Sequence, residues 1–275
     1  MDRSSLTGSG SGEPHPRPGT PPHPFDYPFT TLSASAQSAV WVAEAEAGAR
    51  APDRTADSDA TAAEPEGGLL ALLAVGSNAG HAVMRDKLER QGLDPDFEAE
   101  AALCRDLVVG HSAHLSTPGY VPAAPFAVHG RDAPVTVQWL TSAQVRAIDT
   151  TEPAYQRRTL DPARHRVRTL QGRVCVSVQL YVSRWGLLGP PHEGPWPLTD
   201  QRRLHQLLAG HHDHAVDAAH ELAQHHLASR DAATGLPRAE LSLPAHHERL
   251  RSDVRRRWAG SGWSHDHGLA LVALP

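Results

Sequence analysis

The sequence contains two short polar segments, separated by about 75 residues, whose residue types could bind a small anion and move a proton. The first is Gly76-Ser77-Asn78, which follows an apolar run and precedes a helical pattern. Backbone N–H groups at the start of a helix, together with the helix dipole, suit a carboxylate or a developing oxyanion. A plain turn is the alternative, and for this segment taken alone it is the more common one.

The second segment, residues 137–160, carries Asp149 and Glu152 near the end of a predicted short helix. Acidic groups at that end oppose the helix dipole, so they are poorly placed for stability alone. A carboxylate held at such a junction and partly removed from water could act as a general acid or base. Two solvated carboxylates at a helix terminus are the alternative, and the local sequence favours it.

Because the two segments occur together and in this order, the chain resembles the γ-glutamylcyclotransferase-like family. That family carries a YGSN loop after its first strand and later an LD…E segment, which here read "AVGSNAG" and "VTVQWLTSAQVRAIDTTEPAYQRR". Ile148 and Asp149 stand in the LD positions, Glu152 in the acid/base position, and Tyr155 and Arg157 in the aromatic and basic positions that follow. The resemblance covers roughly residues 69–185.

The resemblance implies a γ-glutamyl substrate, no metal and no other cofactor. The α-amine of the substrate would attack its own side-chain carbonyl, releasing an amine and 5-oxoproline. Glu152 would be the catalytic residue, and the substrate-binding residues would be Val75, Gly76, Ser77, Asn78 and Tyr155. The chain departs from the family pattern at Val75, where the family has an aromatic residue, and at Pro153, where a glycine is usual. These departures keep open a second function, a catalytically degenerate barrel that binds a small molecule or a partner.

The elements that must position these residues follow from hydrophobic periodicity and end signals. Asn78 is expected to cap a helix that ends at Gly92, and Ser142 to cap one that Pro153 terminates. A helical pattern over 198–230 is expected to break near Gly210, and a basic helix is expected over 245–260. The predicted strands cover residues 69–75, 104–115, 133–141, 155–160 and 172–183, with an edge strand interrupted by prolines within 119–130.

Together with the resemblance, these elements predict an α+β fold: a small mixed β-barrel of the γ-glutamylcyclotransferase-like type with flanking helices. Three regions are expected. Residues 1–66 are rich in Gly, Ser and Pro and predict a mostly disordered tail and linker. Residues 67–190 would form the barrel domain, and residues 191–275 a helical C-terminal extension.

Composition excludes several classes of function. The net charge is −5, so a nucleic-acid or anionic-membrane binder is not expected. The N-terminus lacks an apolar signal-peptide core, and no apolar run is long enough to span a membrane, so a cytoplasmic protein is expected. Cys104 and Cys175 are too few for a disulfide scaffold and are expected to be buried thiols. Lys87 is the only lysine. The oligomeric state is left open.

The 19 histidines raise the alternative of a metal site. One helical stripe, formed by His214, Asp217, Glu221 and His225, has suitable spacing. It lies opposite or beside the apolar stripe of Leu204, Leu208, Ala219 and Leu222, so a solvated polar face is favoured. A Ser–His nucleophile is a further alternative, without a GxSxG motif to support it. His111 and His114 flank a strand and would either line a cavity or lie at an edge.

Overall fold

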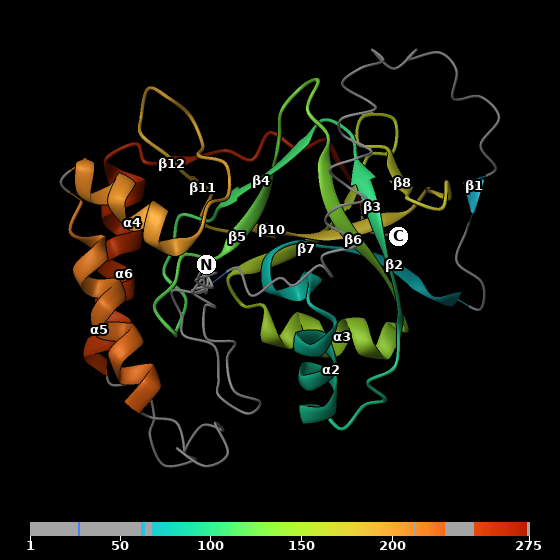
Figure 1. Ribbon diagram of the computed structural model, residues 1–275, viewed down its shortest axis with the longest axis horizontal. Helices are drawn as coiled ribbons and strands as arrows, with labels where there is room; N and C mark the ends of the chain where they lie inside the picture. The colour runs from blue at the N-terminus through green and yellow to red at the C-terminus, as the bar shows by residue number, and fades with distance from the viewer. Residues whose placement is uncertain (1–26, 28–61, 64–67, 212, 229–244, 274–275) are drawn as a thin grey trace, which may run out of the picture.

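The computed structural model describes residues 27, 62–63, 68–211, 213–228 and 245–273. Most of the predicted tail, residues 1–66, therefore lies outside the described residues, and its expected disorder stays a prediction. Figure 1 shows a strongly curled sheet with helices on one side of it and a further group of helices at one end. This arrangement confirms a mixed α+β fold.

Nine strands form the main sheet in the order β1-β9-β8-β3-β6-β2-β10-β7-β13. Their bounds are β1 Ala62–Ala63, β2 Leu70–Ala74, β3 Glu98–Cys104, β6 Ala133–Leu140, β7 Tyr155–Leu160, β8 Val167–Thr169, β9 Val174–Cys175, β10 Val178–Ser183 and β13 Leu271–Val272. Two further pairs join β4 Leu107–His111 to β5 Ala123–Ala127, and β11 Leu187–Leu188 to β12 Ser264–His265. Within the described residues no pairing joins β1 to β13, so the expected barrel is observed as a curled, open sheet.

Strand β2 lies in the interior of the sheet, because another strand pairs with it along each of its edges. It pairs antiparallel with β6 and parallel with β10. Four of its five residues are buried, as expected for the continuous apolar run that the sequence shows there. The polar loop that starts at Gly76 therefore leaves the sheet from its interior.

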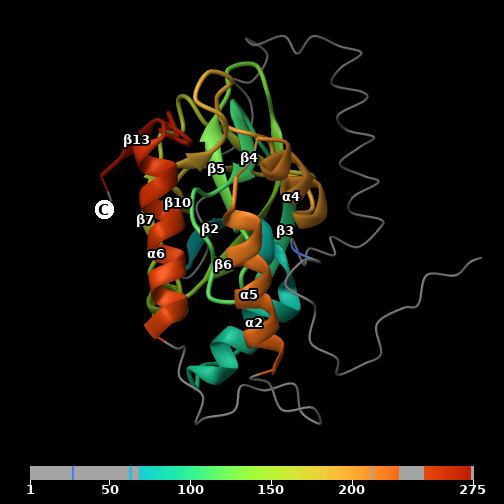
Figure 2. The same ribbon diagram turned by 90° about the vertical axis from the view of Figure 1, so that its left-hand side faces the viewer.

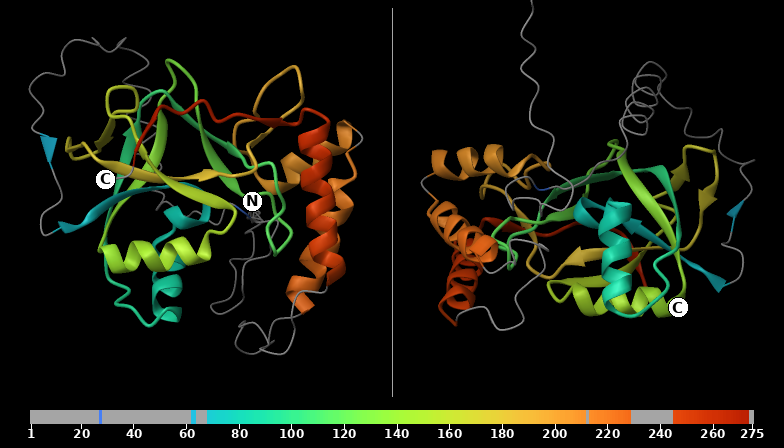
Figure 3. Two further views of the ribbon diagram at one scale, coloured as in Figure 1. Left: turned by 180° about the vertical axis from the view of Figure 1, so that it is seen from behind. Right: turned by 60° about the horizontal axis from the view of Figure 1, so that its bottom comes forward.

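Helices α2 (His81–Arg90) and α3 (Ser142–Thr151) lie on the same side of the sheet in Figures 1 and 3. Between them and the sheet lies an apolar cluster made of Leu72, Met84, Leu88, Leu140, Val145 and Ile148. This packing fixes the N-terminal end of α2 and the C-terminal end of α3, the two ends that carry the candidate site.

In the part of the chain that the structure describes, the other α-helices are α4 (Gln201–Gly210), α5 (Ala215–Ala228) and α6 (Ala245–Gly260). The predicted break near Gly210 is confirmed, and α5 and α6 run side by side in Figure 2. Their core centres on Trp258 and includes Leu204, Leu208 and Leu222. Leu115 and Val121, from the loop before β5, and Leu188 of β11 belong to the same cluster, so these helices pack against the sheet region.

Three local predictions are wrong. Asn78 does not cap α2, because residues Gly76–Ala79 form a short 3-10 helix (η3) and Gly80 takes the N-cap position. Ser142 does not cap α3, because Thr141 does so in a capping box with Gln144. The predicted strand over 172–183 is divided into β9 and β10.

Among the residues that the structure describes, no helix has both the length and the apolar character needed to cross a membrane.

Candidate active site

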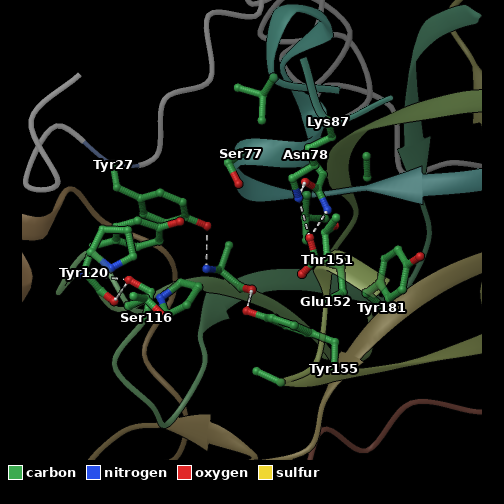
Figure 4. Close-up of a pocket in the computed structure, with 18 of the residues that line it drawn as sticks. Tyr27, Ser77, Asn78, Lys87, Ser116, Tyr120, Thr151, Glu152, Tyr155 and Tyr181 are labelled. Atoms are coloured by element: carbon green, nitrogen blue, oxygen red, sulfur yellow. Dashed lines mark hydrogen bonds and ion pairs between the residues drawn. The ribbon is translucent and has the colours of Figure 1, made fainter. Parts of the chain in front are cut away.

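A cavity of about 700 Å³ opens where β2 ends, between η3, the end of α3 and the loop that leads to β5. It is lined by five of the six predicted site residues, Val75, Ser77, Asn78, Glu152 and Tyr155. The sixth, Gly76, is buried in the same loop. The structure thus brings together residues from both sequence segments, as Figure 4 shows.

Glu152 lies at the C-cap of α3 and points to the loop that carries Asn78. Its Oε1 accepts hydrogen bonds from Asn78 Nδ2 at 3.0 Å and from Lys87 Nζ at 2.6 Å. Lys87 Nζ also donates to Asn78 Oδ1 at 2.8 Å, which closes a triangle of three side chains. The Glu152 side chain is only 13% exposed, so water screens this ion pair weakly.

The position of Asn78 is fixed from the sheet. Gln138, fully buried on β6, donates from its Nε2 to the backbone oxygen of Asn78 at 2.7 Å. Since η3 turns the chain directly after β2, the Asn78 side chain faces the cavity instead of the start of α2. The residue expected as a helix cap is therefore a partner of Glu152.

Asp149 has a different role from Glu152, although both lie near the end of α3. Its carboxylate accepts a bidentate pair of hydrogen bonds from Arg157, at 2.9 and 3.0 Å, and a third from the Tyr181 hydroxyl at 2.8 Å. The bond to Asp149 raises the pKa of Arg157. Asp149 thus ties α3 to β7 and β10, and Glu152 is the carboxylate of the two that lines the cavity.

A strand-borne tyrosine forms another wall. Tyr155, the first residue of β7, donates from its hydroxyl to the backbone oxygen of Ala123 at 2.9 Å. Burial raises the pKa of Tyr155 well above its usual range. The hydroxyl is therefore a neutral hydrogen-bonding group at ordinary pH.

Two aromatic residues that the sequence did not single out also line the cavity. Tyr27 is 2% exposed, and its ring stacks on that of Tyr120 with centroids 4.3 Å apart. Its hydroxyl accepts a hydrogen bond from the backbone N–H of Ala123 at 2.6 Å. Burial raises the pKa of Tyr120 to about 12 and moves that of Tyr27 higher still.

Gly76 is required by this arrangement. Its φ is +60°, a left-handed conformation that a residue with a side chain rarely adopts. A Cβ at this position would also overlap the Tyr27 hydroxyl and the Ala123 methyl group. The loop therefore fits closely around a side chain from the N-terminal segment.

Lys87 and Tyr27 are two of the lining residues that the sequence prediction missed. One sequence feature could have indicated Lys87 as a site residue, because it is the only lysine of the chain and lies on the helix that follows the loop. Tyr27 had no such feature, because it lies in a segment of Pro, Gly and Ser whose composition favours disorder.

The sequence left open whether His111 and His114 line a cavity, and the structure places the two side chains in different surroundings. His114 is 2% exposed and lines the cavity, and its Nδ1 bonds to Ser112 Oγ at 2.7 Å. Burial lowers the pKa of His114 to about 3, and the charges of Arg251 and Arg255 add to this effect. His111 instead bonds to Thr199.

The predicted polar stripe on α5 faces solvent. The side chains of His214 and Asp217 are 82% and 86% exposed, whereas Ala219 and Leu222 are buried. Across the described residues, no group of three or more His, Cys, Asp or Glu side chains is arranged to hold a metal ion. Cys104 and Cys175 are buried and unpaired with each other, as predicted.

No protein-family model matches the sequence, and no curated protein matches it. Among solved structures, a γ-glutamyl cyclotransferase is similar over 67% of this chain and 99% of its own, with 13% identity and a TM-score of 0.32. A protein of Arabidopsis thaliana, determined in solution, is similar over 54% and 91%, with 17% identity and a TM-score of 0.36. An uncharacterized human protein is similar over 68% and 99%, with 12% identity and a TM-score of 0.33. No assignment to a family follows from these similarities.

Proposed function

We propose that the cavity binds a γ-glutamyl compound and that Glu152 catalyses its cyclisation to 5-oxoproline with release of the amine. The observation that carries this proposal is the hydrogen bond between Asn78 and Glu152, two residues 74 positions apart in the chain. It joins the polar loop to the one carboxylate of the second segment that faces the cavity. The volume of about 700 Å³ suits a small metabolite.

The reaction needs one proton carrier. The α-ammonium of the substrate loses a proton to Glu152, and the free amine attacks the side-chain carbonyl, forming the new ring C–N bond. Glu152 gives this proton to the nitrogen of the original amide and takes the second proton from the positively charged ring nitrogen. The intermediate then collapses with cleavage of the original amide C–N bond, and Glu152 returns the second proton to the released amine, which leaves as an ammonium ion. A single carboxylate that acts as base and then as acid therefore balances the reaction.

Lys87 and Asn78 hold Glu152 for this task. Both donate to Oε1, so we assign the proton transfer to Oε2. The ammonium of Lys87 lies 2.6 Å from Oε1 and holds the carboxylate by a charge-assisted hydrogen bond. Holding the base in one orientation also reduces the entropy that must be lost to reach the transition state.

The loop of Gly76, Ser77 and Asn78 supplies the polar groups for the rest of the substrate. Ser77 and Asn78 line the cavity directly beside Glu152. We assign to this loop the substrate carboxylate or the oxyanion that develops on the attacked carbonyl. Such preorganised donors stabilise charge that appears only during the reaction.

The test is incubation of the full chain with a set of γ-glutamyl dipeptides, with 5-oxoproline measured over time. In Glu152→Gln, release should fall by a factor of about 10² to 10⁴, the usual loss for a general acid–base group. Glu89→Gln is the matched control, because it makes the same chemical change on the exposed face of α2. Retained turnover in Glu152→Gln would remove Glu152 from this role.

A second function is favoured by one specific observation. The Lys87–Glu152 ion pair, at 2.6 Å, occupies the carboxylate that the reaction needs, and Pro153 restricts the backbone beside it. A protein that binds the same small molecules without turning them over would keep this ion pair intact. Binding of 5-oxoproline without any turnover of the dipeptide set would favour that function.

A further inference from the structure

The cavity has one wall that comes from far outside the two sequence segments. Tyr27 belongs to the N-terminal part of the chain, yet its hydroxyl bonds to the backbone of Ala123, 96 residues later. Figure 4 shows this side chain on the opposite side of the cavity from Glu152, with its hydroxyl directed inward. Its place at the site therefore depends on tertiary structure alone.

Three contacts fix Tyr27 there. Its ring stacks on Tyr120 at an interplanar angle of 11°. Its oxygen accepts a hydrogen bond from the backbone N–H of Ala123 at 2.6 Å. Gly76 leaves the space that the hydroxyl occupies, since a Cβ there would overlap it. Both the loop and β5 are thus shaped around this one side chain.

Tyr27 bounds the cavity and does not fill it. About 700 Å³ remains with the ring in place, and Tyr27 and Glu152 both line that volume. This space lies within the range usual for small-molecule sites, about 300–1,000 Å³. A small ligand beside Glu152 therefore has room while Tyr27 stays docked.

We propose that Tyr27 is a positioning residue of this site, supplied by the N-terminal segment, whose hydroxyl binds the carboxylate of the ligand next to the loop of residues 76–78. The ligand class rests on the proposed function; the anchoring of Tyr27 at the loop does not. Because burial raises its pKa, the phenol keeps its proton and can donate it to a carboxylate oxygen. The hydrogen bond that it accepts from the backbone N–H of Ala123 polarises the hydroxyl and strengthens it as a donor.

The first experiment measures affinity for 5-oxoproline and for its uncharged primary amide in the wild type, Tyr27→Phe and Tyr27→Ala. Tyr27→Phe keeps the ring and removes the hydroxyl. It should weaken binding of 5-oxoproline by about tenfold or more, and binding of the amide by about threefold, because hydrogen bonds to charged groups are stronger. A general loosening of the cavity would weaken both equally and would overturn the proposal. So would wild-type affinity, or tighter binding, in Tyr27→Phe.

The second experiment needs no ligand. In the full chain, amide hydrogen exchange at Ala123 should be about tenfold faster in Tyr27→Phe, since its N–H loses its acceptor. Tyr181→Phe is the matched control. It removes a hydroxyl that also lines the cavity but bonds to Asp149, so exchange at Ala123 should not change. Unchanged exchange in Tyr27→Phe would overturn the proposal for any ligand.

The two experiments separate this proposal from the proposed function. A wild-type protein that binds neither probe contradicts the proposed function and the ligand role of Tyr27 together. Faster exchange at Ala123 would then still establish that Tyr27 is anchored to the start of β5. Normal probe binding with no effect of Tyr27→Phe contradicts the Tyr27 proposal alone.

Discussion

Around the cavity, side chains from distant parts of the chain bond to one another, whereas on helices α5 and α6 they pair across a surface that faces solvent. Glu152, Asn78 and Lys87 form a closed triangle at the end of β2. On the helices, Glu221 bonds to His246 with both side chains about half exposed. The helices are the region richer in histidine, but the convergence of partly buried groups is what makes a candidate site.

The two regions also differ in what supports them. The triangle rests on the buried cluster between α2, α3 and the sheet. The three-helix region rests on a separate cluster around Trp258, which extends to Leu115 and Val121 in the loop beside the cavity. Because that loop also carries Tyr120, the helices support the wall of the cavity that lies opposite Glu152.

The largest effect is expected from Trp258→Ala, which tests whether the helices support the cavity. Trp258 is fully buried and its Nε1 donates to Asp213 at 2.8 Å. Its removal should lower the free energy of unfolding by about 3–5 kcal/mol, the usual cost of an aromatic core truncation. Chemical denaturation, followed both by circular dichroism and by 5-oxoproline binding, is the measurement. Loss of the helical signal with wild-type ligand affinity would show that the two regions are independent.

The next largest effect is expected on the pH dependence of the free energy of unfolding, to which His114 in the cavity wall contributes. His114 has a pKa of about 3 in the folded protein, against an ordinary 6.5 in the unfolded chain. The unfolded state therefore binds the proton first, so stability is full above pH 6.5 and is lost as the pH falls towards 3. One such group contributes a slope of about 1.4 kcal/mol per pH unit.

Denaturation of the wild type and of His114→Asn between pH 7 and pH 4 measures this contribution. Asn keeps a polar group near Ser112 but does not titrate. The slope of the free energy of unfolding against pH should therefore fall by the contribution of about one bound proton. The matched control is His214→Asn, which makes the same chemical change at an exposed side chain just before α5. An unchanged slope in His114→Asn would contradict the assignment.

A smaller effect is expected from Lys87→Met, which removes one corner of the triangle and leaves the carboxylate partly buried. The release of 5-oxoproline should fall by about 10- to 100-fold, which corresponds to the loss of a hydrogen bond between charged groups. Lys87→Arg keeps the charge and should restore part of the activity. A Lys87→Met protein with wild-type turnover would show that Glu152 needs no cationic partner and would weaken the difference between the two regions.

Much of the framework around the site could be predicted from the sequence. Strand β2 is a short apolar run, and α3 has both helical periodicity and the terminator Pro153. The site pairing of the loop with Glu152 was expected only from the resemblance, since nothing local links them. The cap of α3 was misplaced because Thr141 and Ser142 are adjacent and local preference does not choose between them. The cap of α2 was misplaced because the short helix η3 takes up Asn78 and moves the start of α2 to Gly80.

The residues that escaped prediction share one property, which is that their partners lie far away in the chain. Lys87 meets Glu152 across 65 residues, and Tyr27 meets Ala123 across 96. Neither contact leaves a periodic pattern, because each depends on how the sheet curls and how the elements pack. Tyr27 also lies in a segment whose composition indicates disorder, so its burial could not be read from the residues around it.

The smallest effect is expected from Glu221→Gln, which changes a side chain on the helices that are compared with the cavity. Glu221 is 47% exposed and contacts His246 and His247 at 2.8 and 3.4 Å. Exposed ion pairs contribute little because water and salt screen them, so the free energy of unfolding should change by less than about 1 kcal/mol. Turnover should stay at the wild-type level, since this side chain does not line the cavity. A large loss of turnover in Glu221→Gln, measured beside Glu152→Gln, would place function on the histidine-rich helices and reverse the contrast between the two regions.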